Sequence, residues 1–251
     1  MEEIAVVARW IQEAENIVAF TGAGISTRSG IPDFRSEDSG LWENVDPQRV
    51  ASIFGFRKDP SAFFKWVHPL TKTIIEAKPN PAHAALVKLE EAGKLKAVVT
   101  QNIDMLHTRA GNKNVFELHG HMRLSTCINC FREYPGEPIM EKFLEDGCVP
   151  HCPDCNGVLK PNTILFGEQL PYDQMMGAKK AARDADLLIV VGSSLEVAPA
   201  SDIPLIAKRN GAKLVIINLE PTILDRFADL NVRGDAADIL PVIVECTEKT
   251  T

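Results

Sequence analysis

The sequence predicts an α/β protein built on a parallel β-sheet, with a smaller second domain. Three observations lead to this prediction. Four short apolar runs each end in small or polar residues, segments with helical spacing lie between the runs, and two stretches of different composition interrupt the alternation. A strand that is apolar throughout is buried on both faces, which is typical of a parallel sheet covered by helices.

The first unit opens the chain. Apolar residues recur at helical spacing over residues 4–15, the apolar run 17–20 follows, and the next four residues contain Gly22 and Gly24. This order predicts a helix, a strand and a glycine loop. Apolar runs of the same kind, each followed by small or polar residues, cover residues 95–100, 186–191 and 213–217.

Three further helices are predicted over residues 81–92, 171–183 and 200–210, because each segment begins at a proline or ends before a glycine. The carboxyl ends of parallel strands meet at one edge of a sheet, and open α/β sheets bind ligands there. We therefore expect the loops after the four strands to line one crevice.

Two stretches differ from this alternation. Residues 35–75 are rich in aromatic residues and prolines and predict a small helical insertion. Residues 122–160 hold five of the six cysteines. These two stretches are predicted to form the second domain.

The cysteine-rich stretch predicts a zinc site. Cys127 and Cys130 form one Cys-x-x-Cys pair, Cys152 and Cys155 form another, and 21 residues separate the pairs. Two such pairs can place four thiolates around one tetrahedral Zn²⁺, which closes the shell and makes the metal structural. The alternative is a set of buried thiols or a redox pair. Cys148 belongs to neither pair and is excluded as a ligand.

Composition limits the possible partners. The 251 residues include 27 Lys plus Arg against 34 Asp plus Glu, a formal net charge of −7. The protein as a whole therefore lacks the positive charge with which proteins bind nucleic acids or anionic membranes. The chain begins without a signal sequence and has no membrane-spanning apolar run, so we expect a cytoplasmic protein. Its oligomeric state stays open, and a monomer is compatible with the sequence.

The glycine loop indicates nucleotide binding. Glycines after a buried strand let backbone N–H groups approach a phosphate. Thr27 stands where a dinucleotide fingerprint has its third glycine, so a simple tight turn is the alternative on this pattern alone.

Several longer motifs follow in order along the chain: Gly22-Ala-Gly-Ile-Ser26, Gly30-Ile-Pro-Asp-Phe-Arg35, Thr100-Gln-Asn-Ile-Asp104, Glu117-Leu-His-Gly120, Phe166-Gly-Glu168 and Gly192-Ser-Ser-Leu195. With the two cysteine pairs, they make the chain resemble the sirtuins, which are NAD-dependent protein lysine deacylases. The likeness extends over almost the whole chain.

The resemblance implies a Rossmann-like domain from residues 1–34, 76–121 and 161–251. It also implies a small domain that joins the helical insertion 35–75 to the zinc ribbon 122–160. NAD and an acetyl-lysine protein or peptide would meet in the cleft between them. The acyl oxygen attacks the ribose carbon that bears nicotinamide, nicotinamide leaves, and the acyl group ends on ADP-ribose while lysine is freed.

The resemblance further implies roles for single residues. His119 matches the general base and Asn102 the residue that holds the ribose hydroxyls. Asp104 and Ile103 match the nicotinamide pocket, and Gln101 lies against the ribose. Further expected NAD contacts are Gly22, Ala23, Gly24, Thr27, Asp33, Phe34, Arg35, Ser193, Ser194, Asn218, Asp235 and Ala236. The expected substrate contacts are Leu165, Phe166, Gly167, Glu168 and Val197.

Two details leave alternatives open. His107 and His121 compete with His119 as the base on sequence alone. Relatives that remove acidic acyl groups carry a Tyr-x-x-Arg pair in the insertion, whereas residues 65–72 lack it, so we expect neutral acyl groups as substrates.

Three other functions compete with deacylation. An NAD-dependent protein ADP-ribosyltransferase shares the first half of the reaction. A dehydrogenase would transfer hydride and keep the nicotinamide bond. A non-enzymatic zinc-ribbon module would sense NAD without consuming it.

Overall fold

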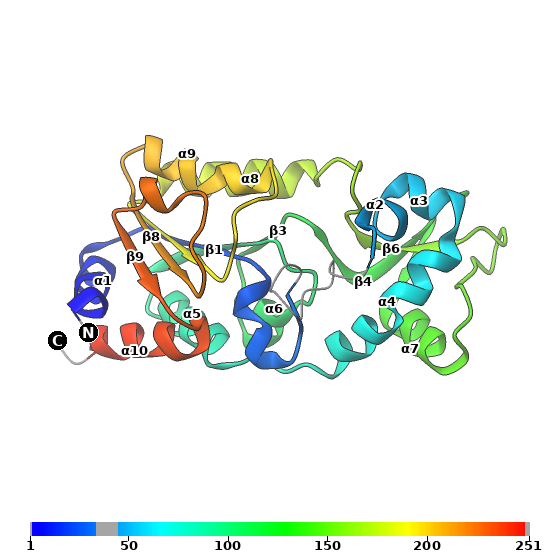
Figure 1. The fold of residues 1–251 in the computed structure, drawn as a ribbon, viewed down its shortest axis with the longest axis horizontal. Coiled ribbons are helices and arrows are strands. Elements are labelled where there is room, and N and C mark those ends of the chain that lie inside the picture. Colours follow the sequence, from blue (N-terminus) through cyan, green and yellow to red (C-terminus); the bar gives the residue numbers. More distant parts are fainter. Residues whose placement is uncertain (1, 34–44, 249–251) are drawn as a thin grey trace.

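The computed structural model describes residues 2–33 and 45–248, and its largest element is a six-stranded sheet (Figure 1). The strand order is β3-β2-β1-β7-β8-β9, and every neighbouring pair is parallel. The strands are β1 (Ile17–Thr21), β2 (Leu95–Thr100), β3 (Val115–Glu117), β7 (Leu187–Val191), β8 (Lys213–Asn218) and β9 (Leu230–Arg233). The predicted parallel α/β architecture is confirmed.

The strand order makes this a doubly wound sheet. The chain winds outward from β1 through β2 to β3, then returns to the other side of β1 and winds through β7, β8 and β9. The direction of winding reverses between β1 and β7. Loops at such a switch point diverge at the carboxyl edge of the sheet and leave a crevice for a ligand.

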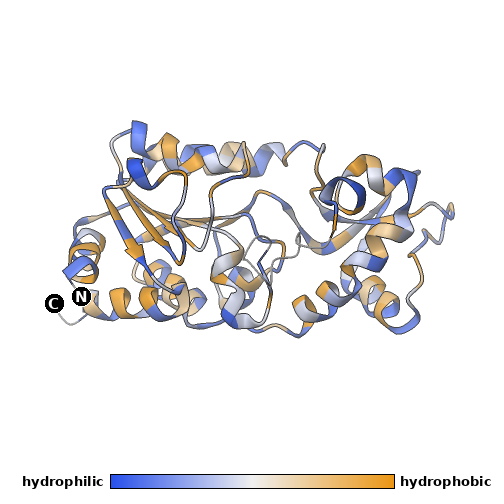
Figure 2. Ribbon diagram, viewed as in Figure 1, coloured by the Kyte–Doolittle hydropathy of each residue, from blue (hydrophilic) through white to orange (hydrophobic). Residues whose placement is uncertain are grey.

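Helices cover both faces of the sheet (Figures 1 and 2). Along β1, Ile17 and Ala19 pack against one helical layer, while Val18 and Phe20 pack against the other. The first layer contains α1 (Glu2–Glu13), α5 (Pro81–Glu91) and α10 (Ala236–Glu248), and the second contains α8 (Tyr172–Asp184) and α9 (Ile203–Arg209). The predicted helix 200–210 begins as a 3₁₀ turn, η3 (Ala200–Asp202). Pro204 has no N–H to donate to the carbonyl of Ala200, so the α-helix begins only at Ile203.

The two interrupting stretches pack together beyond the large sheet (Figure 1). The insertion forms α2 (Pro47–Val50), α3 (Ile53–Lys58) and α4 (Pro60–Glu76). The cysteine-rich stretch forms an antiparallel sheet of β5 (Glu133–Pro135), β4 (Gly120–Cys127) and β6 (Leu159–Thr163), with α7 (Gly136–Asp146) inserted.

One core joins the insertion to the ribbon. Phe64 of α4 meets Phe143 of α7 with ring centroids 5.1 Å apart. Phe56, Val67 and Met140 belong to the same core. This packing supports the small domain expected from the sequence, whose boundaries stay a prediction. Among the described helices, none is long and apolar enough to cross a membrane.

Candidate active site

A cavity of about 1160 Å³ opens at the switch point, and both the large sheet and the small domain contribute to its lining. It gathers the loops after β1, β2, β7 and β8, as predicted from the strand ends. Every expected NAD or substrate contact in the described part of the chain lines this cavity. Phe34 and Arg35 lie outside the described residues.

The loops after β1 and β7 touch at their glycines. The N–H of Gly24 donates to the carbonyl oxygen of Gly192 over 2.9 Å. A Cβ atom on Gly22 would lie 2.7 Å from that same oxygen, which is closer than real Cβ atoms approach. Gly22 and Gly24 are therefore required for the close approach of these loops. Ala23 and Thr27 line the cavity beside this contact.

Asn102 is fixed in the loop after β2. Its side-chain Nδ2 donates to the carbonyl oxygen of Gly22 over 3.0 Å, and its backbone N–H donates to Oγ1 of Thr100 over 3.0 Å. These bonds orient the amide. Its Oδ1 receives no hydrogen bond from residues 2–33 or 45–248 and can accept one from a ribose hydroxyl or water.

Asp104 is almost fully buried, with 4% of its surface exposed. One carboxylate oxygen accepts from the N–H of Leu106 over 2.8 Å, and the other accepts from Oγ of Ser26 over 2.7 Å. Burial raises the pKa of Asp104, and these two hydrogen bonds oppose that rise. The carboxyl group is thus held in one orientation at the cavity wall.

His119 is held as a neutral imidazole. Its Nδ1 lies 2.9 Å from the carbonyl oxygen of Gln101, which can only accept, so Nδ1 carries the proton and Nε2 keeps its lone pair. Burial lowers the pKa of His119 below its ordinary value of 6.5, and the bond to Gln101 opposes this in part. The imidazole is therefore mostly unprotonated at neutral pH.

The rival histidines lie elsewhere. His107 is buried behind β1, where its Nε2 lies 2.9 Å from Oγ1 of Thr21, and burial lowers its pKa to about 3. His121 lines a separate, smaller cavity beside Arg123. Of the three histidines, only His119 lines the large cavity.

The expected substrate segment is built as a turn between the two domains. Phe166 bonds to the insertion, because its N–H donates to Ala51 and its carbonyl accepts from Ile53. Glu168 turns back on its own loop, where its carboxylate accepts from the N–H of Leu165 over 2.8 Å and pairs with Lys160 over 3.1 Å. Leu165, Gly167 and Val197 line the cavity on either side.

Sequence reasoning missed an apolar part of this cavity. One face of α4 supplies side chains at helical spacing, and the ribbon supplies two methionines. These residues are Phe63, Trp66, Val67, Leu70, Ile74, Met122 and Met140. The signal was present in the sequence as apolar residues recurring every three or four positions over 60–76.

The four predicted metal ligands converge. Their Sγ atoms lie within 4.8 Å of one another, with 3.4 Å between Cys127 and Cys155 and 3.7 Å between Cys130 and Cys152. A tetrahedral Zn²⁺ with four thiolates requires sulfur separations of about 3.8 Å, so the cluster fits this ion. Cys148 bonds to the carbonyl of Asp146 instead and does not join the cluster.

The sheet is doubly wound and has a glycine crevice at its switch point, with a histidine lining that crevice. Together with the closed four-cysteine centre, these features define a dinucleotide-binding protein with a structural metal site. The sequence model of the Sir2 family matches residues 22–199. The chain is also 47% identical over 244 residues to the NAD-dependent protein deacetylase of Sulfolobus acidocaldarius, covering 97% of this chain and 95% of that protein. The chain belongs to the Sir2 family.

Two solved Sir2 structures are similar throughout. One is a histidine-to-alanine variant with a deacetylated peptide and 3'-O-acetyl ADP ribose, with 42% identity, a TM-score of 0.91 and coverage of 97% of this chain and 98% of that one. The other is Sir2Af2 bound to a myristoylated histone peptide, with 39% identity, a TM-score of 0.85 and coverage of 99% and 98%.

Proposed function

We propose that this chain is an NAD-dependent protein lysine deacetylase that transfers the acyl group of acyl-lysine to ADP-ribose and releases nicotinamide. The observation that carries this proposal is the junction of three features in one cavity. The cavity is lined by the glycine crevice, by the neutral imidazole of His119 and by the turn at residues 165–168. Its apolar part, formed by one face of α4 with Met122 and Met140, is called the apolar channel below. The named activity of the Sulfolobus relative supports the same function.

The residues act in a definite order in this proposal. Asp104 and Ile103 hold the nicotinamide carboxamide, and Asn102 orients the ribose hydroxyls. The acyl oxygen displaces nicotinamide from the ribose carbon. Nε2 of His119 then takes the proton from a ribose hydroxyl, which attacks the acyl carbon and starts its transfer away from lysine. The lysine nitrogen takes up a proton and leaves the acyl carbon, and water adds to that carbon in its place. The bond from the carbon to the original acyl oxygen then breaks and leaves this oxygen on the ribose as a hydroxyl, so the products are lysine, nicotinamide and O-acyl-ADP-ribose.

The roles of the remaining cofactor residues follow from their places in the cavity. Gly22, Ala23, Gly24 and Thr27 would lie against the phosphates, and Asp33 lines the same cavity. Ser193 and Ser194 lie in the loop after β7, and Asn218 ends β8, on the other side of the switch point from β2. Asp235 and Ala236 line the cavity at the point where α10 begins.

A closed shell of four thiolates gives Zn²⁺ a folding role, because it leaves no position for a water or substrate. Tyr134 supports one ligand directly, since its hydroxyl lies 3.1 Å from Sγ of Cys152. In this proposal the metal holds the small domain together while the chemistry proceeds in the cavity. Action in the cytoplasm, without nucleic-acid or membrane contacts, stays a prediction.

The proposal is tested by mass spectrometry of an acetyl-lysine peptide incubated with the protein, with and without NAD. We expect loss of the acetyl group only with NAD, and O-acetyl-ADP-ribose among the products. ADP-ribose attached to protein would favour the transferase, and an absorbance rise at about 340 nm would favour a dehydrogenase. NAD binding with no reaction would favour the sensing module.

The apolar channel predicts the acyl preference. Its lining by the face of α4 offers hydrocarbon contacts, and the cavity lining contains no arginine among the described residues. We expect a myristoyl peptide to be bound at least about tenfold more tightly than the acetyl peptide, because each buried CH₂ contributes up to about 0.8 kcal/mol. We expect the succinyl peptide to react at least about tenfold more slowly, since its carboxylate would be buried against the apolar side chains of α4.

Parallel kinetic assays with acetyl, myristoyl and succinyl versions of one peptide measure this preference. Substitution of Leu70 by Arg, in the channel, should reduce the myristoyl advantage. Equal rates for the succinyl and acetyl peptides would contradict the assignment of the channel to neutral acyl groups.

A further inference from the structure

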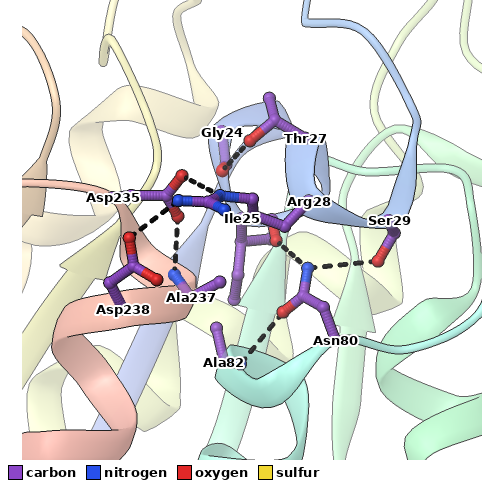
Figure 3. A network of polar contacts seen from close by, with 10 residues as sticks. All are labelled: Gly24, Ile25, Thr27, Arg28, Ser29, Asn80, Ala82, Asp235, Ala237 and Asp238. Carbon is purple, nitrogen blue, oxygen red and sulfur yellow. Dashed lines mark hydrogen bonds and ion pairs between the residues drawn. The ribbon is translucent and has the colours of Figure 1, made fainter.

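The glycine loop is tied to a distant part of the chain by one arginine (Figure 3). Arg28 lies in the turn η2 (Thr27–Ser29), which continues the loop after β1. Its Nε donates to Oδ2 of Asp235 over 2.7 Å, and one of its terminal nitrogens donates to Oδ2 of Asp238, also over 2.7 Å. One guanidinium thus bridges two carboxylates at the start of α10, more than 200 residues away in the sequence.

The bridge fixes the orientation of Asp235. Its second carboxylate oxygen accepts from the N–H of Ala237 over 2.8 Å, which caps α10. Both oxygens of this side chain therefore already have partners within the protein. Residues 234–236 line the cavity next to Thr27, so what they offer a ligand is mainly backbone.

A second tie holds the same loop from the opposite side, as Figure 3 shows. Nδ2 of Asn80 donates to the carbonyl of Ile25 over 2.7 Å and to Oγ of Ser29 over 3.1 Å, while its Oδ1 caps α5 through Ala82. Asn80 is buried, whereas the side chain of Arg28 is 56% exposed. The buried tie joins the loop to α5, and the exposed tie joins it to the start of α10.

We propose that Arg28 is a positioning residue for NAD: by bridging Asp235 and Asp238 it holds the glycine loop and the start of α10 at the separation that the bound dinucleotide spans. This inference rests on the proposed function for the identity of the ligand. Arg28 itself is not among the residues that line the cavity, so it acts through the two segments that it joins. A planar guanidinium suits this task because it presents two N–H groups to two carboxylates at fixed angles.

The role predicts a particular kinetic pattern. Removing the bridge leaves the loop attached through Asn80, so the fold and the chemical step persist while NAD meets a less ordered site. Exposed ion pairs contribute little free energy, so Arg28→Ala should raise KM for NAD only about fivefold, with kcat changed less than about twofold. Asp238→Asn should raise KM about two- to threefold, and Arg28→Lys should fall between wild type and Arg28→Ala.

The experiment combines steady-state kinetics, calorimetric titration with NAD in the absence of peptide, and melting curves. Arg9→Ala is the matched control, because Arg9 makes an exposed pair with Glu13 far from the cavity. Increasing salt from about 0.05 M to about 0.5 M should weaken NAD binding by wild type more than by Arg28→Ala, since screening acts on the bridge. Asn80→Ala should lower the melting temperature more than Arg28→Ala does.

Unchanged NAD affinity in Arg28→Ala would overturn the inference. So would a loss of melting temperature equal to that of Asn80→Ala, because Arg28 would then be a structural residue. Calorimetry separates this result from failure of the proposed function. If wild type binds NAD without deacylating any peptide, the deacetylase assignment fails while the change in NAD affinity still decides the role of Arg28.

Discussion

Replacement of His119 by alanine is expected to lower kcat for peptide deacetylation by about 10²–10⁴-fold, the usual contribution of a positioned general base. Nε2 of this residue carries the lone pair, because Nδ1 donates to the carbonyl of Gln101. NAD binding should change little, since the glycine crevice and Asn102 are intact. Single-turnover assays and calorimetry with NAD measure the two effects separately. His121→Ala is the control, because His121 lines a different cavity.

The same residue predicts the dependence on pH. A base acts in its unprotonated form, and burial lowers the pKa of His119 below 6.5. Activity should therefore be high at about pH 8 and fall as the imidazole is protonated at acidic pH, with the midpoint of the decline below about pH 6.5. A His119→Ala variant with kcat within about tenfold of wild type, or a wild-type decline centred well above pH 7, would contradict the role of His119 as the base.

Replacement of Cys127 by serine is expected to remove the bound zinc and abolish activity. Cys127 is fully buried in the ribbon, where it shares a small core with Cys152 and Leu159. Structural zinc contributes about 10–16 kcal/mol in zinc-finger peptides, which equals or exceeds the about 5–15 kcal/mol that stabilises a whole domain. Without it, the ribbon should unfold and disturb the core that it shares with α4.

Zinc content per chain, circular dichroism and activity are the measurements for this prediction. Cys148→Ser is the matched control, since Cys148 lies in the same stretch but outside the cluster. A strong chelator applied to wild type should reproduce the effect of Cys127→Ser. Retention of one zinc per chain by Cys127→Ser, or its loss from Cys148→Ser, would show that the ligands are wrongly assigned.

The sequence predicted those parts of the fold in which local pattern and tertiary environment agree. The four predicted strands are the four central ones of the sheet, where both faces are covered and most residues are buried and apolar. The edge strands β3 and β9 are only partly buried and carry mixed residues, so no continuous apolar run marks them. The helix α7 was hidden because it interrupts the cysteine ribbon between its two pairs.

The residues of the candidate site likewise fall into those that local sequence predicts and those that it does not. Residues directly after strands, such as Gly22, Asn102 and Ser193, were predictable because parallel strands bring their carboxyl ends to one edge. The ion pairs of Arg28 were not, since nothing local connects residue 28 to residue 235. Trp66 was also missed as a cavity residue, because an apolar helical face looks the same in sequence whether it covers a core or lines a cavity. Met140 was missed because its helix α7 was not predicted.

The proposed reaction is tested most sharply by counting nicotinamide released against lysine deacetylated, with purified protein, NAD and an acetyl-lysine peptide. We expect one nicotinamide for each lysine freed, and a rate of release that falls to background when the peptide is omitted. Nicotinamide release without peptide, or deacetylation without nicotinamide, would contradict the proposed reaction, because the acyl oxygen would then not be the group that displaces nicotinamide from the ribose.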